Sequence, residues 1–305
     1  SRRGKVGAGL IRSGEGGSLS IEPGAYGLFL NQRDPGHAFA CHASLPELGA
    51  GVDADPLPSL QGPEATNLVY VARVLVVYTA DARAGAGGVD GMNALIDLAA
   101  AQANDVLENS RTNLRIQVVH RAEVSYAESG DFNIDLARLR STNDGQLDQV
   151  HALRTTHQAD LVSLFVERSD SNVAGLAYVM SPVRTGFQSD AFSVCLRWPL
   201  ITFYVFIHEL GHNFGCQHDR AASTTGGAYS YSYGYKFEAG GLGRHTVMAL
   251  STNAIVPNFS SPAIEFEGVP TGIASGPNSA DNARSINNAA STVAAFRAPA
   301  TTVLL

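Results

Sequence analysis

The chain of 305 residues is long enough for one large domain or two modest ones. Hydrophobic residues make up 45% of it, which is enough to bury a sizeable core and excludes a chain that is disordered throughout. The 28 acidic residues outnumber the 21 basic ones and give a formal net charge of −7. We therefore expect neither nucleic acid nor membrane as a partner, because both need clustered positive charge.

At the N-terminus the chain begins with Ser, and its first ten residues lack an apolar segment of signal-peptide length. The share of charged residues, 16%, is low, a composition that we associate with secreted proteins. No apolar run reaches the roughly 18 residues of a membrane span. We expect a soluble, secreted monomer from which any signal has already been removed.

The first 64 residues differ in composition from the rest. Residues 4–24 are rich in Gly and Ser, and an apolar run at 26–30 predicts a short strand. Pro and Gly punctuate residues 56–63, a pattern typical of a linker. We therefore divide the chain into an irregular N-terminal segment, residues 1–64, and a main domain, residues 65–305.

The main domain begins with VYVARVLVVYT at 69–79, whose β-branched and aromatic residues predict a strand buried on both faces. Further elements are expected in turn: a helix at 91–110, a strand at 114–126, helical segments near Asp131 and at 145–155, a strand at 160–167, and shorter strands at 174–182 and 190–197. This alternation predicts an α/β (α+β) fold class with a mixed sheet and covering helices.

Residues 208–219 read HELGHNFGCQHD. His208 and His212 lie four residues apart in the apolar segment LITFYVFIHELGHNF, for which we expect a helix with Pro199 near its start. That spacing puts both imidazoles on one helical face, where they can share a metal. Glu209, beside the first histidine, is placed to reach a metal-bound water.

The third histidine follows a glycine. Gly215 can adopt the left-handed conformation that ends a helix, and the resulting turn lets His218 supply a third nitrogen. Three neutral imidazoles with an open position suit a catalytic zinc ion. Downstream, Met248 in HTVMAL is expected in a tight turn that forms an apolar floor under the histidines without binding zinc itself.

Together, HExxHxxGxxH and Met248 resemble the metzincin clan of zinc endopeptidases, over residues 65–297. Asp219 after the third histidine and Leu250 two positions after Met248 are similar to the reprolysin (adamalysin) branch, and the C-terminal tail resembles that of bacterial secreted members. The resemblance implies a metzincin-like twisted mixed sheet with a zinc helix and a Met-turn. It also implies protein or peptide substrates, and it allows structural calcium, although no Asp-rich loop identifies a calcium site.

The residues support hydrolysis of peptide bonds by a zinc-activated water, with Glu209 as the general base. The substrate would lie extended along an edge strand, for which 175–179 is the candidate, with an ordinary sheet strand as the alternative. Ile255, Val256 and Phe259 hint at an apolar pocket wall beyond Met248.

The alternative from another class of function is a catalytically idle metzincin-like domain used for binding. Its signature would be the loss of Glu209 or of a metal ligand. Neither is lost.

The three cysteines, Cys41, Cys195 and Cys216, leave one unpaired. We expect a disulfide between Cys195 and Cys216 that ties the segment entering the zinc helix to the loop leaving it. Cys41 would then be the fourth zinc ligand of a latent zymogen, in which its thiolate displaces the water as in a cysteine switch. The segment FACHAS at 39–44 does not match the sequence of the matrixin pro-segment. The alternative is a buried or disulfide-bonded Cys41. The remaining histidines are expected to be neighbours, surface or core residues: His37, His42, His120, His151, His157 and His245.

Overall fold

The computed structural model describes residues 9–12, 18–24, 27–31, 40–44, 68–170 and 173–304, and for the first four of these ranges it describes the backbone alone. These four ranges are strands β1 (Gly9–Arg12), β2 (Ser18–Gly24), β3 (Gly27–Asn31) and β4 (Ala40–Ser44). The N-terminal segment is therefore less irregular than expected, since β1, β2 and β3 pair as an antiparallel sheet.

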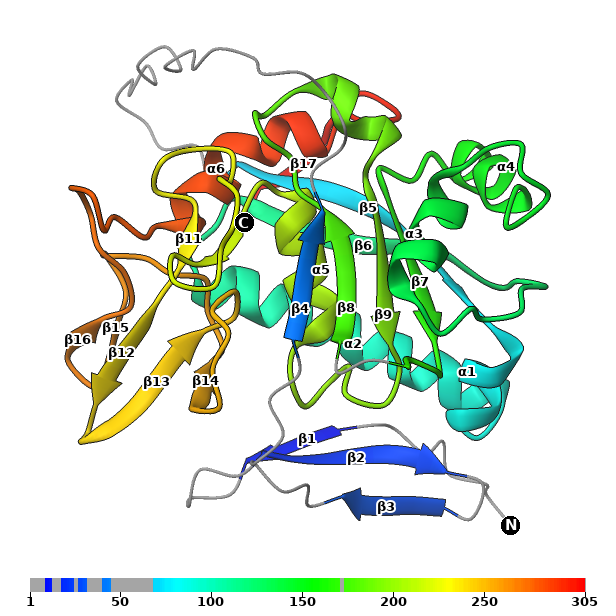
Figure 1. The fold of residues 1–305 in the computed structure, drawn as a ribbon, viewed down its shortest axis with the longest axis horizontal. Helices are drawn as coiled ribbons and strands as arrows, with labels where there is room; N and C mark the ends of the chain where they lie inside the picture. Colours follow the sequence, from blue (N-terminus) through cyan, green and yellow to red (C-terminus); the bar gives the residue numbers. More distant parts are fainter. Residues whose placement is uncertain are drawn as a thin grey trace.

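A seven-stranded mixed sheet forms the centre of the main domain (Figure 1). Its strands are β4, β5 (Leu68–Tyr78), β6 (Leu114–Glu123), β7 (Leu161–Val166), β8 (Val173–Tyr178), β9 (Phe192–Leu196) and β17 (Thr301–Leu304). Strands β6, β5, β7 and β9 are parallel in that order, β8 runs antiparallel beside β9, and β4 pairs in parallel with the outer edge of β8. The mixed α/β sheet expected from the sequence is confirmed.

Two hydrophobic cores cover the two faces of this sheet. One packs under α1 (Ala80–Gly85), α2 (Val89–Asn109), α5 (Val205–Asn213) and α6 (Asn282–Val293). The other packs under α3 (Phe132–Arg140) and α4 (Gln149–Thr156). Alternate residues of β5 enter opposite cores, Val74 and Val76 the first, Leu75 and Val77 the second. Burial on both faces of the sheet therefore explains the nearly continuous apolar run at 69–79.

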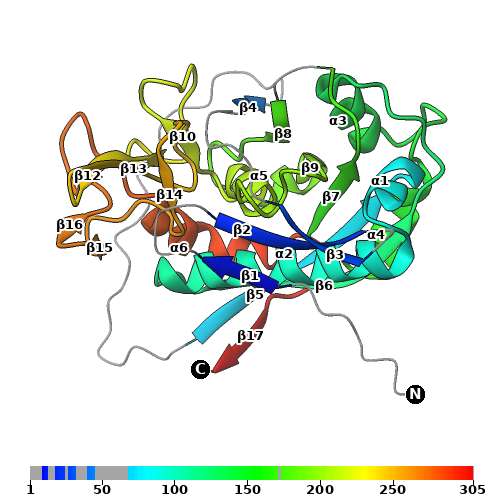
Figure 2. The same ribbon diagram turned by 90° about the horizontal axis from the view of Figure 1, so that it is seen from below.

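The C-terminal part of the domain lies to one side of the main sheet in both views (Figures 1 and 2). It holds the short strands β10 (Gln217–Asp219), β11 (Tyr233–Gly234), β12 (Lys236–Ala239), β13 (Leu242–Thr246), β14 (Ala254–Val256), β15 (Glu265–Phe266) and β16 (Val269–Pro270). The sequence analysis did not predict these pairings. None of the helices in the described residues is long and apolar enough to cross a membrane.

The helix that carries the histidine motif begins later than the apolar pattern predicts. Between Pro199 and Tyr204 the chain forms turns, in which the Phe203 N–H donates to the Pro199 carbonyl at 3.0 Å. Tyr204 has a left-handed backbone conformation, φ +57°, and α5 follows from Val205 to Asn213. Pro199 therefore starts a turn and not the first turn of the helix.

The expected disulfide is wrong, because Cys195 and Cys216 are both free, buried thiols. The two sulfurs face different partners. The Sγ atom of Cys195 lies 3.6 Å from the Ser163 hydroxyl within the sheet, whereas Sγ of Cys216 lies 3.7 Å from the Asn282 carbonyl at the start of α6. Burial raises the pKa of both thiols, so both stay protonated.

Candidate active site

Helix α5 and the turn after it bring three histidines together. His208 and His212 project from the same face of the helix, with ring centroids 5.0 Å apart. Gly215, φ +91°, ends the helix against Ala228, where an added Cβ would lie 2.5 Å from the Ala228 Cβ. Strand β10 then returns His218, whose Nε2 lies 3.1 Å from Nε2 of each of the other two. The convergence expected from the sequence spacing is confirmed.

Backbone carbonyls orient the two helical imidazoles. Nδ1 of His208 lies 2.8 Å from the Val247 carbonyl, and Nδ1 of His212 lies 3.0 Å from the Cys216 carbonyl. With Nδ1 donating a hydrogen bond, Nε2 of each ring presents its lone pair to the shared centre. Burial lowers the pKa of His208 to about 4 and that of His212 to about 3, because an imidazolium is poorly solvated there. The rings are therefore neutral at neutral pH, as metal ligands must be.

These three histidines are the single group of His, Cys, Asp or Glu side chains in the described residues that could hold a metal ion. Three imidazole nitrogens with room for a further ligand suit zinc. Calcium, which binds through oxygen ligands, finds no such cluster in the same part of the chain.

Glu209 is fully buried directly against strand β8. A Cβ added to Gly175 of β8 would lie too close to the Glu209 carboxylate to be tolerated, so the glycine leaves the space that this side chain fills. The negative charge of Glu209 also contributes to the raised pKa of Cys195, which places the carboxylate near that thiol. Glu209 thus lies between the helix that carries the histidines and the strand expected to bind substrate.

Met248 packs under the histidine helix, as expected. Its side chain is fully buried, and a Cβ added to Gly211 of α5 would lie 2.6 Å from its sulfur atom. The preceding residue, Val247, supplies the carbonyl that orients His208. The turn therefore sets the position of one imidazole through a direct hydrogen bond as well as forming a floor.

Asp219 has a structural role that the sequence analysis missed. One oxygen of its carboxylate accepts a hydrogen bond from the Leu250 N–H at 3.1 Å and forms an ion pair with Lys236 at 3.0 Å. The residue after the third histidine is thereby tied to the residue two positions after Met248. This contact links the two halves of the site, and no local sequence pattern reveals it.

A small cavity of about 50 Å³ opens beside His208 and Ala174 of β8. Ile255 lines it as expected, but Val256 and Phe259 pack in hydrophobic cores instead, so the predicted apolar wall is wrong for these two. The remaining walls include the side chains of His245 and Ser251. His245, expected to be an ordinary surface or core residue, therefore lies at the candidate site.

The substrate-binding edge expected at 175–179 is β8, and it carries β4 along its outer side. In this parallel pairing Cys41 is in register with Gly175, the residue that lies against Glu209. The side chain of Cys41, like His37 and His42, lies outside what the structure describes.

A family model and curated relatives both indicate a metallopeptidase. Residues 70–260 match the model of a family described as metallo-peptidase family M12. The chain is 38% identical over 231 residues to a peptidyl-Asp metalloendopeptidase of Stenotrophomonas maltophilia (strain R551-3), covering 74% of this chain and 52% of the relative. It is 36% identical over 230 residues to a protein of the same name from Xanthomonas campestris pv. campestris, covering 74% and 51%.

The chain therefore spans about half the length of these curated relatives. Among solved structures, a chain described as part of a chaperone–substrate complex matches 75% of this chain and 35% of its own length. The TM-score is 0.59 at 18% sequence identity, a likeness of fold alone.

Proposed function

The chain belongs to metallo-peptidase family M12, and from that premise we propose that it is a secreted zinc-dependent endopeptidase. The observation that carries this proposal is the convergence of three buried imidazoles next to a buried carboxylate. His208, His212 and His218 would hold the zinc ion. Secretion is supported by the low share of charged residues.

When bound, zinc supplies a Lewis acid that polarises the scissile carbonyl and acidifies water. Glu209 acts as the general base, takes a proton from the attacking water and delivers it to the departing amine. Its burial between α5 and β8 holds the carboxylate in one position, so that the proton moves over a short, defined path. The Val247 and Cys216 carbonyls keep two of the three imidazoles in the tautomer that binds metal.

Cleavage of casein by the processed protein tests this function. We expect the cleavage to be abolished by a chelator, restored by zinc, and lost in Glu209→Gln while zinc binding persists. A catalytically idle binding domain would instead bind zinc and leave casein intact. The presence of Glu209 and of all three histidines supports the enzyme.

We further propose a preference for bonds at aspartate, the specificity named for the relatives. The cavity beside His208 is the candidate pocket. Its volume of about 50 Å³ holds roughly four water-sized groups. This size matches the four heavy atoms of an aspartate side chain better than it matches the greater number of heavy atoms in longer side chains. His245 and Ser251 offer polar contacts, and no carboxylate from the described part of the chain lines the cavity to repel an acidic group.

Peptides that differ only at one position, Asp, Asn, Glu or Leu, measure this preference. We expect kcat/KM to be highest for Asp, and the Asp-to-Leu ratio to fall at least tenfold in His245→Leu. An Ile255→Val variant, which changes the same cavity without removing a polar group, serves as the control. An unchanged Asp-to-Leu ratio in His245→Leu would assign the selectivity to another residue.

We also propose that residues 1–64 keep the enzyme latent, with Cys41 as a fourth zinc ligand before activation. Support comes from β4, which lies along β8, the edge where an extended substrate would pair. The register of Cys41 with Gly175 brings the backbone of residue 41 close to Glu209. A thiolate at the metal would displace the water that hydrolysis requires.

Zinc-edge X-ray absorption of the uncleaved chain distinguishes this mechanism from simple strand blockage. We expect a sulfur scatterer at about 2.3 Å that disappears in Cys41→Ser, together with a rise in activity. His42→Ala, in the same strand, is the matched control and should stay latent. If Cys41→Ser remains fully latent, the thiol has no part in inhibition.

A further inference from the structure

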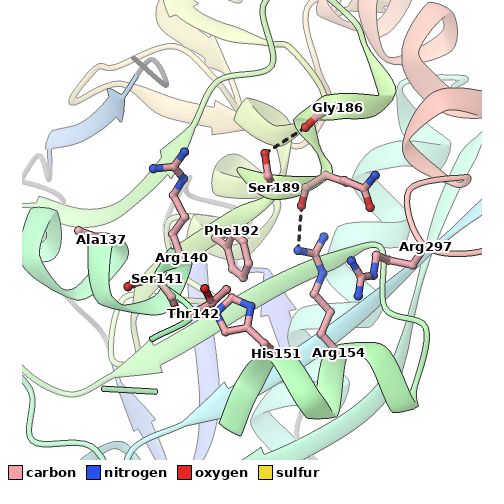
Figure 3. A pocket seen from close by; sticks show the side chains of 11 residues that line it. Ala137, Arg140, Ser141, Thr142, His151, Arg154, Gly186, Ser189, Phe192 and Arg297 are labelled. Carbon is pink, nitrogen blue, oxygen red and sulfur yellow. Dashed lines mark hydrogen bonds between the residues drawn. The ribbon is translucent and has the colours of Figure 1, made fainter. Parts of the chain in front are cut away.

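A cavity of about 670 Å³ lies between α3, α4, the short 3₁₀ helix η1 (Thr185–Ser189) and the chain that follows α6. Its charged side chains come from distant parts of the sequence, and Figure 3 shows Arg154 and Arg297 close together with Arg140 across from them. Among the described residues no Asp or Glu side chain lines it. Its aromatic wall, Phe192, belongs to the core under α3 and α4, whereas the zinc helix packs in the other core.

Arg154 is an unusual residue to find buried, with 3% of its surface exposed. Its guanidinium stacks over the Phe192 ring at 4.8 Å and donates to the carbonyls of Ala159, Gln188 and Asp160. All three acceptors are neutral carbonyls, so they satisfy hydrogen bonds without supplying a negative charge. A buried cation of this kind is costly unless an anion balances it.

Arg297 adds a second positive charge to the same cavity. Its guanidinium donates to the Thr155 hydroxyl at 2.8 Å, again a neutral acceptor. Burial, and then the charge of Arg297, lower the pKa of Arg154 to about 9, while the charge of Asp160 opposes that shift. Among the described residues neither arginine forms a salt bridge.

The Asp160 carboxylate, whose charge acts on Arg154, is also bound by another arginine. Asp160 receives two hydrogen bonds from the Arg73 guanidinium and accepts others from the backbone N–H groups of Arg73 and Arg297. Across the cavity, Arg140 is likewise neutralised by Asp190 at 2.6 Å. Around the cavity, the positive charges of the four arginines therefore exceed the negative charges of Asp160 and Asp190 by two.

We propose that this cavity binds a doubly charged tetrahedral oxyanion, phosphate or sulfate, either free or as a monoester. Planar guanidinium groups match the oxygens of such anions, and two of them together offset a charge of −2. The side chains of Ser141 and Thr142 line the same cavity and supply neutral donors. The volume exceeds that of a bare anion, so an esterified group would also fit. This site goes beyond the proposed peptidase function and shares no residue with it.

Isothermal titration of the zinc-loaded protein with inorganic phosphate tests the proposal, at constant ionic strength maintained with chloride. A parallel titration with glycerol phosphate separates the two sources of the anion, since tighter binding of the monoester indicates an esterified ligand and equal or weaker binding a free ion. We expect saturable binding of phosphate that weakens at least tenfold in Arg297→Gln, because a charged hydrogen-bond donor is lost.

Arg297→Gln is preferred to a change at Arg154, which supports three backbone carbonyls and whose loss would unfold the region. Arg168→Gln removes an exposed arginine paired with Asp170 at another site and is the matched control, expected to bind phosphate as the unmodified chain does. Absence of saturable binding, or equal affinity in Arg297→Gln and Arg168→Gln, would overturn the proposal. Binding that involved only the zinc site would give that second result.

Discussion

Replacing Gly175 with alanine tests how the candidate base is positioned. Gly175 lies in the middle of β8, opposite Cys195 of β9, and its Cα faces the carboxylate of Glu209. An alanine Cβ would lie much closer to the carboxylate than any van der Waals contact allows. Because Glu209 is fully buried, the side chain can only move by displacing the strand or by rotating away from the metal centre.

Two magnitudes follow from this contact. Overpacking of a buried site costs about 1–3 kcal/mol, which for a domain of this size lowers the melting temperature by roughly 2–10 °C. A shift of about 1 Å in a catalytic group costs on the order of 100-fold in rate. Since the histidines are untouched, we expect kcat to fall roughly 100-fold while zinc content and KM change little.

The assay compares steady-state peptide hydrolysis, zinc content and melting temperature of Gly175→Ala with those of Gly226→Ala. A Cβ added at Gly226 meets nothing within 4 Å, so this control introduces the same methyl group without a clash. If Gly175→Ala retains the kcat of the control, the glycine does not set the position of Glu209. The assignment of that carboxylate as the base would then lose its geometric support.

Three further results are expected. Asp219→Ala should lower the free energy of unfolding by roughly 1–3 kcal/mol and weaken zinc binding, because the hydrogen bond to the Leu250 N–H is lost. Chemical denaturation measures the stability and zinc titration measures the affinity. Unchanged values of both would contradict the structural role of this hydrogen bond. In the metal-free chain, His208 and His212 have pKa values of about 4 and about 3, below the ordinary 6.5. As the pH falls from 6.5 to about 4, the unfolded chain therefore binds more protons than the folded chain, and the free energy of unfolding should decrease over that range. A free energy of unfolding in urea that does not change with pH would refute this. Cys195 and Cys216 should react with a thiol reagent only after unfolding, and reductant should leave the melting temperature unchanged; a drop on reduction would indicate a disulfide.

Much of the site could be predicted from the sequence because its geometry is local. Two histidines four residues apart share a helix face wherever that helix lies, and a glycine three residues later permits the turn that returns the third. Strands β5 and β7 of the central sheet are equally predictable, since burial on both faces leaves a nearly continuous apolar run. The exact start of α5 is not predictable in this way, because Leu200, Ile201 and Tyr204 are buried although they lie in turns and not in a helix.

Contacts between distant segments were decided by the tertiary structure alone. The sequence by itself determined which residues can bind a metal, because spacing and residue type carry that information, and the resemblance to the metzincin clan associated Met248 with them. Only the folded chain showed that Cys195 and Cys216 face different partners, and that His245 lines the cavity beside His208. It also brought Arg154 and Arg297 to one cavity. Such pairings depend on how sheet and helices pack segments that are separated in the sequence, and no local pattern encodes that packing.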